Sequence, residues 1–370
     1  MRILIVTQKI DEQDDVLGFM HGWIAEFAKQ AERVTAICLE KGSVNLPNNV
    51  SVFSLGKERF IIHNSKFIIL RRAVYAVRFW YYIWSARRNY DAVFVHMNPE
   101  YVVLGGIFWK LWGKTVTLWY AHKSVTWHLR LAHFFTDIIF TSTASGFRLP
   151  SRKVRVIGQG IDTGKFKSQK EKVKSEEGEF RIVTVGRIAQ SKDYDTLIDA
   201  VEIVKRSGDG GIRVDIIGPT SNVSDEEYLA RLKQKVCQKD LSENISFHSA
   251  VSNVDLPAVF SKYDLFVNMG RTGSLDKAVA EAMASGLPVL TSNEAFKEVL
   301  GPYKGDLMYP AGDIEAFASK IKYMIDLPSE KRKELGLGLR DIVVRDHSLQ
   351  SFVSKIISAI QSFQNQKNEK

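Results

Sequence analysis

The residues best suited to chemistry lie between positions 268 and 291, in the stretch NMGRTGSLDKAVAEAMASGLPVLT. Its pattern predicts a strand end, a turn rich in Gly, Ser and Thr, a short helix carrying Glu281, a Gly-Leu-Pro break and a second strand. Such a unit presents backbone N–H groups and a helix N-terminus to an anionic ligand. Upstream, Arg187 and Lys192 share one loop and can both bind a diphosphate, Arg as a fork and Lys as a point charge. Alone, two such cations are more typical of a solvated loop, and a lone Glu on a helix normally lies on the surface.

Two series of strands alternating with helices must position these residues. We expect strands at residues 2–7, 34–39, 50–55, 91–95, 115–120, 138–142 and 154–157, and then at 180–185, 213–218, 245–247 and 265–267. Helical patterns cover residues 18–30, 66–89, 196–206, 226–239, 256–262, 316–327, 329–345 and 349–363, and the polar tail after them should be frayed. The alternation predicts an α/β fold with parallel sheets covered on both faces. His96 and His122 follow neighbouring strands, at the edge where ligands bind in open α/β sheets.

Length and composition favour a two-domain protein of a reducing compartment. The chain has 370 residues, of which 45% are hydrophobic, and its two cysteines, Cys38 and Cys237, lie far apart. Neither a disulfide framework nor a cysteine metal site is indicated, and MRILIVTQ reads as a strand rather than a signal peptide. We therefore expect a cytoplasmic protein.

The positive charge belongs to the first half of the chain. Residues 1–170 hold 24 Lys and Arg against 12 Asp and Glu, whereas residues 171–370 hold 27 against 30. Residues 51–170 alone carry 19 basic and 5 acidic side chains. This distribution predicts an anionic partner for the first half.

Two segments raise the question of a membrane. Residues 66–89, KFIILRRAVYAVRFWYYIWSARRN, interleave aromatic and basic residues, which suits either the headgroup layer of a membrane or a core helix with solvated arginines. Both readings have similar weight. Residues 101–121 are apolar over about one membrane thickness, but Lys110, Gly113 and Lys114 favour a helix, a turn and a strand inside a soluble domain.

Four stretches carry a family resemblance that covers nearly the whole chain: FVHMNPEYVV (94–103), VIGQGID (156–162), VGRIAQSKDYDTLIDAV (185–201) and EAMASGLPVLTS (281–292). Together they resemble family 4 of the retaining glycosyltransferases, whose GT-B architecture has two facing Rossmann-like domains. The resemblance implies an acceptor-binding domain at 1–165, a linker at 166–179, a nucleotide-sugar donor domain at 180–345, and a C-terminal helix at 346–370 that crosses back to the first domain. Domain closure would then bring His96 over the donor and exclude water.

The resemblance also assigns site residues. His96 is expected beside the donor sugar, with Arg187 and Lys192 at the diphosphate and Glu281 on the ribose hydroxyls. The remaining donor-binding residues would be Gly273, Ser274, Leu275, Asp276, Lys277, Gly218, Val251 and Gly18, and the weaker acceptor-side candidates are His122 and Lys123. The donor would be linked to UDP or GDP, and no further cofactor is required. For His96, a core histidine satisfied by the backbone is the alternative.

The turn before Glu281 departs from the family pattern. The family usually has a glutamate eight residues before the one matching Glu281, where this chain has Gly273, and that carboxylate usually contacts the transferred sugar. Asp276 and Lys277 stand where Gly and an apolar residue or Pro are common. We expect Asp276 to cap the helix, while Lys277 adds a third cation near the diphosphate. The departure concerns the identity of the sugar more than the donor class.

Two acidic motifs are better explained without a metal. Asp193-Tyr194-Asp195 mimics an Asp-x-Asp motif, but it begins a helix, where aspartates act as caps. The residues at 11–15, DEQDD, lack ligand spacing and read as a solvated loop. We expect no required metal.

Three functions are compatible with these patterns. The first is a metal-independent enzyme that moves a sugar from a nucleotide diphosphate to an acceptor, such as a lipid-linked or polysaccharide precursor at the cytosolic face of a membrane. The second is a catalytically silent nucleotide-sugar-binding or scaffold homologue, motivated by Gly273. The third, a nucleic-acid binder, has only the positive charge behind it and lacks a recognisable module, so we expect no nucleic-acid partner.

Overall fold

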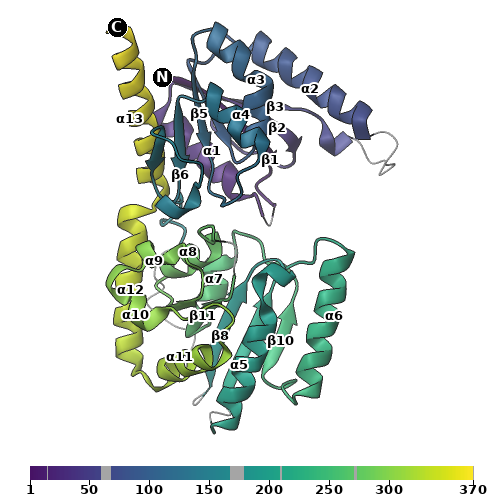
Figure 1. Cartoon of the computed structure of the whole chain (residues 1–370), viewed down its shortest axis with the longest axis vertical. Helices are drawn as coiled ribbons and strands as arrows, with labels where there is room; N and C mark the ends of the chain where they lie inside the picture. The colour runs from purple at the N-terminus through teal and green to yellow at the C-terminus, as the bar shows by residue number, and fades with distance from the viewer. Residues whose placement is uncertain (15, 60–67, 167–178, 209–210, 271–272, 370) are drawn as a thin grey trace. The chain divides into compact units, whose positions relative to one another are not determined.

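The computed structural model describes the chain except residues 15, 60–67, 167–178, 209–210, 271–272 and 370 (Figure 1). The chain divides into two compact units, which are described separately. The first unit combines Met1–Gly160 with Leu349–Lys370, and the second comprises Ile161–Ser348. Most of the linker expected at 166–179 lies outside the described residues.

The first unit is built on a seven-stranded parallel sheet. Its strands are β1 (Arg2–Ile10), β2 (Arg33–Lys41), β3 (Val50–Ser54), β4 (Ala92–His96), β5 (Thr115–Trp119), β6 (Ile138–Thr141) and β7 (Val154–Val156). Its helices are α1 (Phe19–Gln30), α2 (Ile68–Ser85), α3 (Pro99–Leu111), α4 (Trp127–Phe135) and α13 (Leu349–Asn368), with short 3-10 turns at Lys57–Arg59 and Ala144–Gly146. The strand order β3-β2-β1-β4-β5-β6-β7 is that of a Rossmann-like sheet.

Apolar side chains on both faces of this sheet explain the helical layers. Phe94 of β4 packs in a cluster with α1 and α13, whereas its neighbours Val93 and Val95 pack in a second cluster with α2, α3 and α4. Consecutive strand residues point to opposite faces, so a continuous apolar run requires cover on both. In Figure 1 the helices accordingly lie on both sides of the sheet.

The C-terminal helix α13 is part of the first unit. Phe352 packs on Trp23 of α1 with ring centroids 4.3 Å apart, and the Trp23 Nε1–H donates to the carbonyl of Gly160 at 2.8 Å. The expectation of a frayed tail after residue 363 was wrong, because α13 continues to Asn368. Phe363 still packs on the core, and Gln364 Nε2 lies 3.5 Å from the carbonyl of Asp91.

The second unit repeats the same plan with five parallel strands. They are β8 (Phe180–Val185), β9 (Ile212–Ile217), β10 (Ile245–His248), β11 (Leu265–Asn268) and β12 (Val289–Thr291), in the order β10-β9-β8-β11-β12. The helices are α5 (Tyr194–Arg206), α6 (Val223–Gln238), α7 (Leu256–Phe260), α8 (Lys277–Ala284), α9 (Phe296–Val299), α10 (Lys304–Leu307), α11 (Ile314–Asp326) and α12 (Ser329–Asp346), with 3-10 turns at Gln190–Lys192 and Gly301–Tyr303. The predicted α/β class with two Rossmann-like sheets is confirmed.

The segment expected to form a helix, a turn and a strand at residues 101–121 does so. Helix α3 ends at Leu111, Gly113 adopts a left-handed φ of 70°, and β5 begins at Thr115. Among the described residues, none of the helices combines the length and apolar character that crossing a membrane requires.

Candidate functional site

The carboxyl ends of four neighbouring strands in the second unit bring the predicted donor-site residues to one edge of the sheet. Because the strands are parallel, the loops after β8, β9, β10 and β11 share that edge. The β8 loop carries Arg187 and Lys192, and Gly218 follows β9. Val251 follows β10 and packs on the core, while the turn after β11 leads into α8.

Gly218 has a structural reason to be glycine. A Cβ atom added there would lie 2.0 Å from the carbonyl oxygen of Gly186. A backbone hydrogen bond from Gly186 N to Ile217 O at 2.9 Å joins the two loops, and Gly218 N donates to the carbonyl of His248, at the end of β10, at 3.1 Å. A side chain at position 218 would therefore force apart the loop that carries Arg187.

Asp276 joins the β8 loop to the start of α8. Its Oδ1 accepts from the backbone N–H of Ala278 at 3.3 Å, which confirms the predicted N-cap role. Its Oδ2 accepts from Asn268 Nδ2 at 3.1 Å and forms an ion pair with the ammonium of Lys192. The cation expected at the diphosphate is thus already oriented by a carboxylate.

Glu281 is a buried carboxylate rather than a surface residue. It is 3% exposed, and its Oε1 accepts from Asn253 Nδ2 at 3.2 Å and forms an ion pair with Lys277 one helical turn earlier. Asn253 Oδ1 in turn accepts from Lys165 Nζ at 2.7 Å. Burial, followed by the neighbouring charge of Lys277, lowers the pKa of Lys165. A buried carboxylate requires such partners because an isolated charge is costly to desolvate.

Asn253 and Lys165 were not predicted from the sequence. Asn253 contacts Glu281, and Lys165 contacts Asn253, each from a distant part of the chain. No local spacing therefore pointed to them. The pairing of Lys277 with Glu281, by contrast, follows from their separation of four residues on a helix. The third cation predicted near the diphosphate is therefore paired with the carboxylate predicted for the ribose.

Arg187 has a different acidic neighbour from Lys192. Its Nε lies 3.9 Å from Oδ2 of Asp225, and its side chain is 52% exposed, whereas that of Asp225 is 10% exposed. The same Oδ2 accepts from Ser221 N at 3.1 Å and from Asn222 Nδ2 at 3.2 Å. The Arg187 guanidinium thus keeps most of its donors available to a ligand.

The turn before α8 is only partly described, because residues 271–272 lie outside the described part of the chain. Gly273 has a φ of 65°, a left-handed conformation that favours glycine. The carbonyl of Ser274 accepts from Asn293 Nδ2 at 2.7 Å, and Leu275 is buried in the core. The buried hydroxyl of Ser274 has no hydrogen-bond partner among the described residues. This hydroxyl is therefore available to water or to a ligand at the turn.

The Asp193-Tyr194-Asp195 segment has structural partners. Asp193 takes the N-cap position of α5 with a φ of 55°, but its carboxylate accepts from the hydroxyl of Thr196 at 2.9 Å instead of making the expected cap bond to a backbone N–H. Asp195 accepts from the hydroxyl of Tyr228 at 2.9 Å and pairs with Lys235 at 3.3 Å. The prediction of caps was therefore correct for the position of Asp193 and wrong for the role of Asp195.

The acidic loop near residue 11 is less solvated than expected. The Nζ of Lys9 lies 3.4 Å from Asp11 and 2.7 Å from Asp14. Asp14 also accepts from the backbone N–H groups of Val16 and Leu17. These carboxylates hold the loop together through one lysine.

His96 ends β4 in the first unit and is surrounded by aromatic rings. It is 4% exposed, stacks on Trp119 with centroids 5.2 Å apart and meets Trp23 edge-on at 5.5 Å. Its Nδ1 lies 3.4 Å from Thr7 Oγ1, and its carbonyl accepts from Asn98 N at 2.7 Å. Burial lowers the pKa of His96 to about 3, so the imidazole is neutral at physiological pH.

The other first-unit candidates lie in the loops at the same edge. The Nδ1 of His122 accepts from Ser124 N at 3.1 Å, and Lys123 is half-buried. Gly18 directly precedes α1, where a Cβ atom would lie 2.4 Å from the carbonyl of Asp14. Gly18 is therefore required by local packing, whatever ligand it contacts.

Four buried polar atoms near this edge have no hydrogen-bond partner among the residues that the structure describes. They are Trp119 Nε1, Thr141 Oγ1, Ser142 Oγ and Gln159 Oε1. Trp119 and Thr141 are the last residues of β5 and β6. Because buried polar groups are nearly always satisfied, this edge suits a ligand with several hydroxyl groups or bound water.

Comparisons with known proteins agree with this architecture. Residues 165–338 match the family model described as glycosyl transferases group 1. The chain is 30% identical over 112 residues to mannosylfructose-phosphate synthase of Agrobacterium fabrum, covering 30% of this chain and 25% of that protein. It is 25% identical over 256 residues to the lipopolysaccharide core biosynthesis mannosyltransferase LpsB of Rhizobium meliloti, covering 66% of this chain and 69% of the relative.

A solved structure shows the same fold over the full length. The Anabaena protein HepE, in complex with UDP and glucose, superposes with a TM-score of 0.73 at 16% identity, covering 98% of this chain and 100% of that one. This likeness shows the fold. The family match at residues 165–338 confirms the predicted resemblance at the level of the group, while family 4 remains a prediction. The match to the group 1 glycosyltransferases covers residues 165–338, nearly half of the chain and most of the second unit.

Proposed function

We propose that the protein transfers a sugar from a nucleoside diphosphate sugar, linked to UDP or GDP, to a hydroxyl group of an acceptor. The observation that carries the proposal is the buried carboxylate of Glu281 at the ligand-binding edge of the second sheet, 3% exposed and held by an amide and an ammonium. Such a carboxylate can accept two ribose hydroxyls. Mannosylfructose-phosphate synthase and LpsB, the relatives described above, are named for sugar transfer or synthesis, and HepE was solved with UDP.

In this proposal Arg187 and Lys192 bind the diphosphate. The bond between the anomeric carbon and the diphosphate oxygen breaks, and its electron pair stays on the leaving phosphate. Negative charge therefore grows on that oxygen in the transition state, where two nearby cations stabilise it more than they stabilise the bound donor. No protein nucleophile is needed for this step.

We further propose that transfer occurs with retention of configuration. The acceptor oxygen attacks the anomeric carbon from the face that the diphosphate leaves, and its proton passes to the departing phosphate oxygen. Supporting this is the resemblance in sequence to retaining enzymes. His96 is our candidate in the first unit for positioning the sugar. As a neutral, buried imidazole it would act through hydrogen bonding or its backbone carbonyl rather than as a charged acid.

The first unit is the proposed acceptor side. The partnerless polar atoms at the ends of β5 and β6 suit a hydroxyl-rich acceptor, such as a polysaccharide precursor. His122 and Lys123 remain weaker candidates near that edge. The excess of basic residues in the first half favours an anionic acceptor, and a lipid-linked diphosphate sugar at the cytosolic face of a membrane has that charge.

Peripheral membrane contact is part of the proposal, and α2 supports it. One face of this helix is buried through Phe79 and Ile83, while Ile69, Tyr81 and Trp84 are 83%, 61% and 55% exposed. An exposed apolar and aromatic face beside arginines suits the interfacial layer of a bilayer. Flotation with liposomes containing anionic lipid at low salt tests this contact, and absence of co-flotation would refute it.

The catalytic proposal is tested with Arg187→Ala, Lys192→Ala and Glu281→Ala. Loss of a hydrogen bond to a charged group costs about 1.5–3 kcal/mol, so each variant should lower kcat/KM for donor turnover by about 10- to 150-fold. Exposed Lys262→Ala is the matched control. A thermal-shift screen with UDP and GDP sugars first identifies the donor, because a ligand that binds the folded state raises its apparent stability. Near-normal turnover in the three variants would contradict the proposal.

A second candidate is a nucleotide-sugar-binding homologue without catalysis. Gly273 favours it, because the related family usually has a glutamate at this position and glycine has no side-chain carboxylate. Calorimetry would then show donor binding that depends on Glu281, with no sugar released or transferred across a broad panel of acceptors. Turnover with any acceptor would exclude this candidate.

A further inference from the structure

Two adjoining pockets in the first unit have complementary chemistry. One, of about 630 Å³, is lined mainly by basic and polar residues, and the other, of about 380 Å³, is almost entirely apolar. Lys110 and Phe134 line both, so the pockets meet along these two side chains. Basic and apolar surfaces therefore adjoin within one small area.

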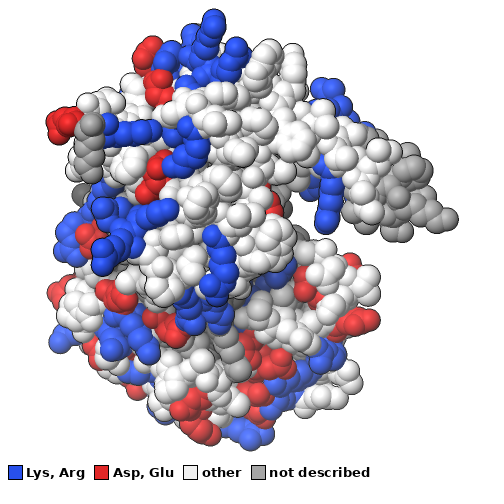
Figure 2. Space-filling model, turned by 45° about the horizontal axis from the view of Figure 1, so that its top comes forward, with Lys and Arg blue, Asp and Glu red and all other residues white. Residues whose placement is uncertain are grey.

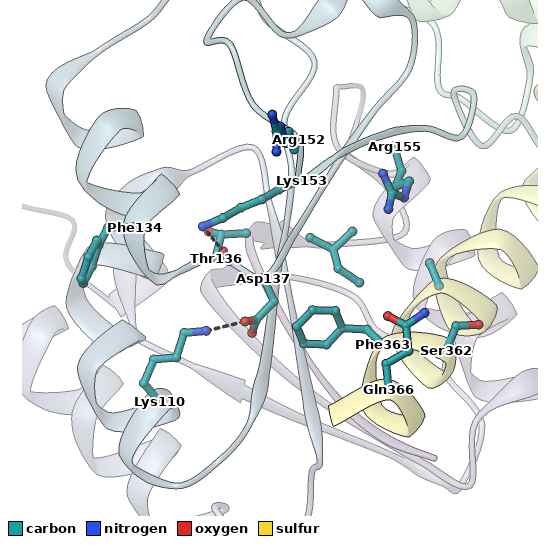
Figure 3. Close-up of a pocket in the computed structure, with 12 residues that line it drawn as sticks. Lys110, Phe134, Thr136, Asp137, Arg152, Lys153, Arg155, Ser362, Phe363 and Gln366 are labelled. Atoms are coloured by element: carbon teal, nitrogen blue, oxygen red, sulfur yellow. Dashed lines mark hydrogen bonds and ion pairs between the residues drawn. The ribbon is translucent and has the colours of Figure 1, made fainter. Parts of the chain in front are cut away.

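The lining of the basic pocket includes one carboxylate, Asp137, and four cations: Lys110, Arg152, Lys153 and Arg155. Lys110 pairs with Asp137 at 2.5 Å, and Lys153 donates to the carbonyl of Thr136 at 2.8 Å, so both lysines are fixed in the wall. Figure 3 shows these two contacts on one side of the pocket and Phe363 and Gln366 of α13 on the other. Arg152 and Arg155 are exposed and have no acidic partner among the described residues.

The apolar pocket lies between α3 and α4. Ile107 and Leu111 of α3 are 54% and 77% exposed, and Phe134 of α4 is 75% exposed. Phe135 completes the lining. Large apolar side chains gathered on a surface mark a site for a partner or a membrane.

The paired pockets are distinct from the predicted catalytic edge of the same unit. Asp137 precedes β6 and Lys153 precedes β7, so both lie at the amino ends of these strands. His96 and Thr141 end β4 and β6 at the opposite edge of the sheet. A ligand in the paired pockets would therefore not occupy the acceptor site proposed above.

We propose that the paired pockets bind an anionic phospholipid of a bilayer, with its phosphate at Arg152 and Arg155 and an acyl chain along Leu111 and Phe134. Charge complementarity favours a phosphate headgroup, and the adjoining apolar pocket favours a ligand with a hydrocarbon tail. The proposal rests on the membrane contact proposed for α2 and specifies a second, lipid-selective contact. Figure 2 shows Lys and Arg side chains at several places on one face of the molecule, with uncharged areas between them.

A nucleic acid or a free phosphate would account for the arginines but not for the tail pocket. A polyanion gains no binding free energy from Ile107, Leu111 and Phe134, because covering these side chains is favourable only for an apolar partner. The exposed aromatic residues make a lipid the better occupant, because aromatic and basic side chains together suit the interface of a membrane.

Co-sedimentation of the full chain with phosphatidylcholine liposomes, with and without phosphatidylglycerol, tests the inference. Each basic residue near an anionic surface contributes about 1 kcal/mol, or about fivefold in affinity. Arg152→Ala/Arg155→Ala should therefore weaken binding to phosphatidylglycerol liposomes by about 30-fold, and Arg152→Lys/Arg155→Lys should restore most of it. Phe134→Asp should weaken binding by about tenfold or more, since it removes an exposed aromatic side chain that the acyl chain would cover.

The controls separate this site from general charge and from catalysis. Lys262→Ala and Val254→Asp alter exposed residues of the second unit and should leave liposome binding unchanged. Soluble glycerophosphoglycerol, a headgroup without tails, should compete poorly. Donor hydrolysis in solution should stay within twofold in all lipid-site variants, so failure of the catalytic proposal would leave this result intact.

Three results would overturn the inference. The double Arg variant could bind phosphatidylglycerol liposomes as the unaltered protein does, which would leave only the α2 contact. Full displacement by glycerophosphoglycerol would show that the headgroup alone is bound. No sedimentation with either liposome would remove the lipid site and the membrane contact together.

Discussion

Lys277→Met should destabilise the second unit because it leaves Glu281 as a buried, unpaired carboxylate. The side chain of Glu281 is 4% exposed and that of Lys277 is 21% exposed. Removing one partner of a fully buried ion pair costs about 3–5 kcal/mol. Partial exposure of Lys277 and the remaining hydrogen bond from Asn253 reduce this cost, so we expect a loss of about 2–3 kcal/mol in the free energy of unfolding.

The reciprocal variant should cost less. Glu281→Gln leaves Lys277, which is the more exposed partner and can turn toward water, so a loss of about 1 kcal/mol is expected. In Lys277→Met/Glu281→Gln no buried charge remains unpaired. The double variant should therefore be more stable than Lys277→Met alone, and the two effects should be non-additive.

Hydrogen exchange followed by mass spectrometry is the appropriate assay. All seven tryptophans lie between residues 23 and 127, in the first unit, so tryptophan fluorescence would not report on α8. Exchange of peptides from β8, β11 and α8 in increasing urea gives the free energy of opening. Lys297→Met, on the exposed side of α9, is the control and should change it by less than about 0.5 kcal/mol. If Lys277→Met behaves like this control, or if the double variant is additive, the ion pair does not stabilise Glu281.

Two further predictions concern His96, which is buried, and Gly218, which is closely packed. The lowered pKa of His96 means that the folded first unit binds fewer protons than the unfolded chain, so its stability is full above pH 6.5 and falls as the pH drops toward 3. At pH 5 the loss should reach about 2 kcal/mol by tryptophan fluorescence, and a wild-type-like acid profile in His96→Gln would contradict it. Gly218→Ala should lower the stability of the second unit by about 1–3 kcal/mol in hydrogen exchange, because its methyl group meets Gly186 O at 2.0 Å. Gly305→Ala, where nothing lies within 4 Å, should be neutral, and equal effects would refute the packing argument.

The sequence predicted the elements correctly where the hydrophobic periodicity and the flanking turn or capping residues agree. The strands before His96 and Glu281, the turn at Gly113 and the cap at Asp276 all have a local signal that the structure retains. Strand β1 shows the limit: it was expected to end at Thr7 but continues to Ile10, because Lys9 pairs across the sheet with Glu40 at 3.1 Å. A polar residue in a strand is stabilised there by a partner that lies far away in the chain.

The candidate site was predicted in the same uneven way. Types and spacing pointed to Arg187, Lys192 and Glu281, and the i,i+4 relation linked Lys277 to Glu281. Neither Asn253 nor Lys165 has a local pattern, since each acts through a contact formed only when distant loops meet. The paired pockets were not predicted for the same reason, because α3, α4, β7 and α13 contribute to them from four separate segments of the chain.

The paired charges around the donor site bear on how it would select a ligand. Lys192 is neutralised by Asp276 and Lys277 by Glu281, while Arg187 has Asp225 nearby. A bare phosphate would have to compete with these carboxylates for the same cations, so charge alone gives it little advantage. A nucleoside diphosphate sugar brings hydroxyl groups for Glu281 and an aromatic base in addition to its charge. Residues 171–370 as a whole also carry a small excess of acidic groups. In the proposed function, the balance of charge at the turn before α8 therefore favours the complete donor over its anionic fragments.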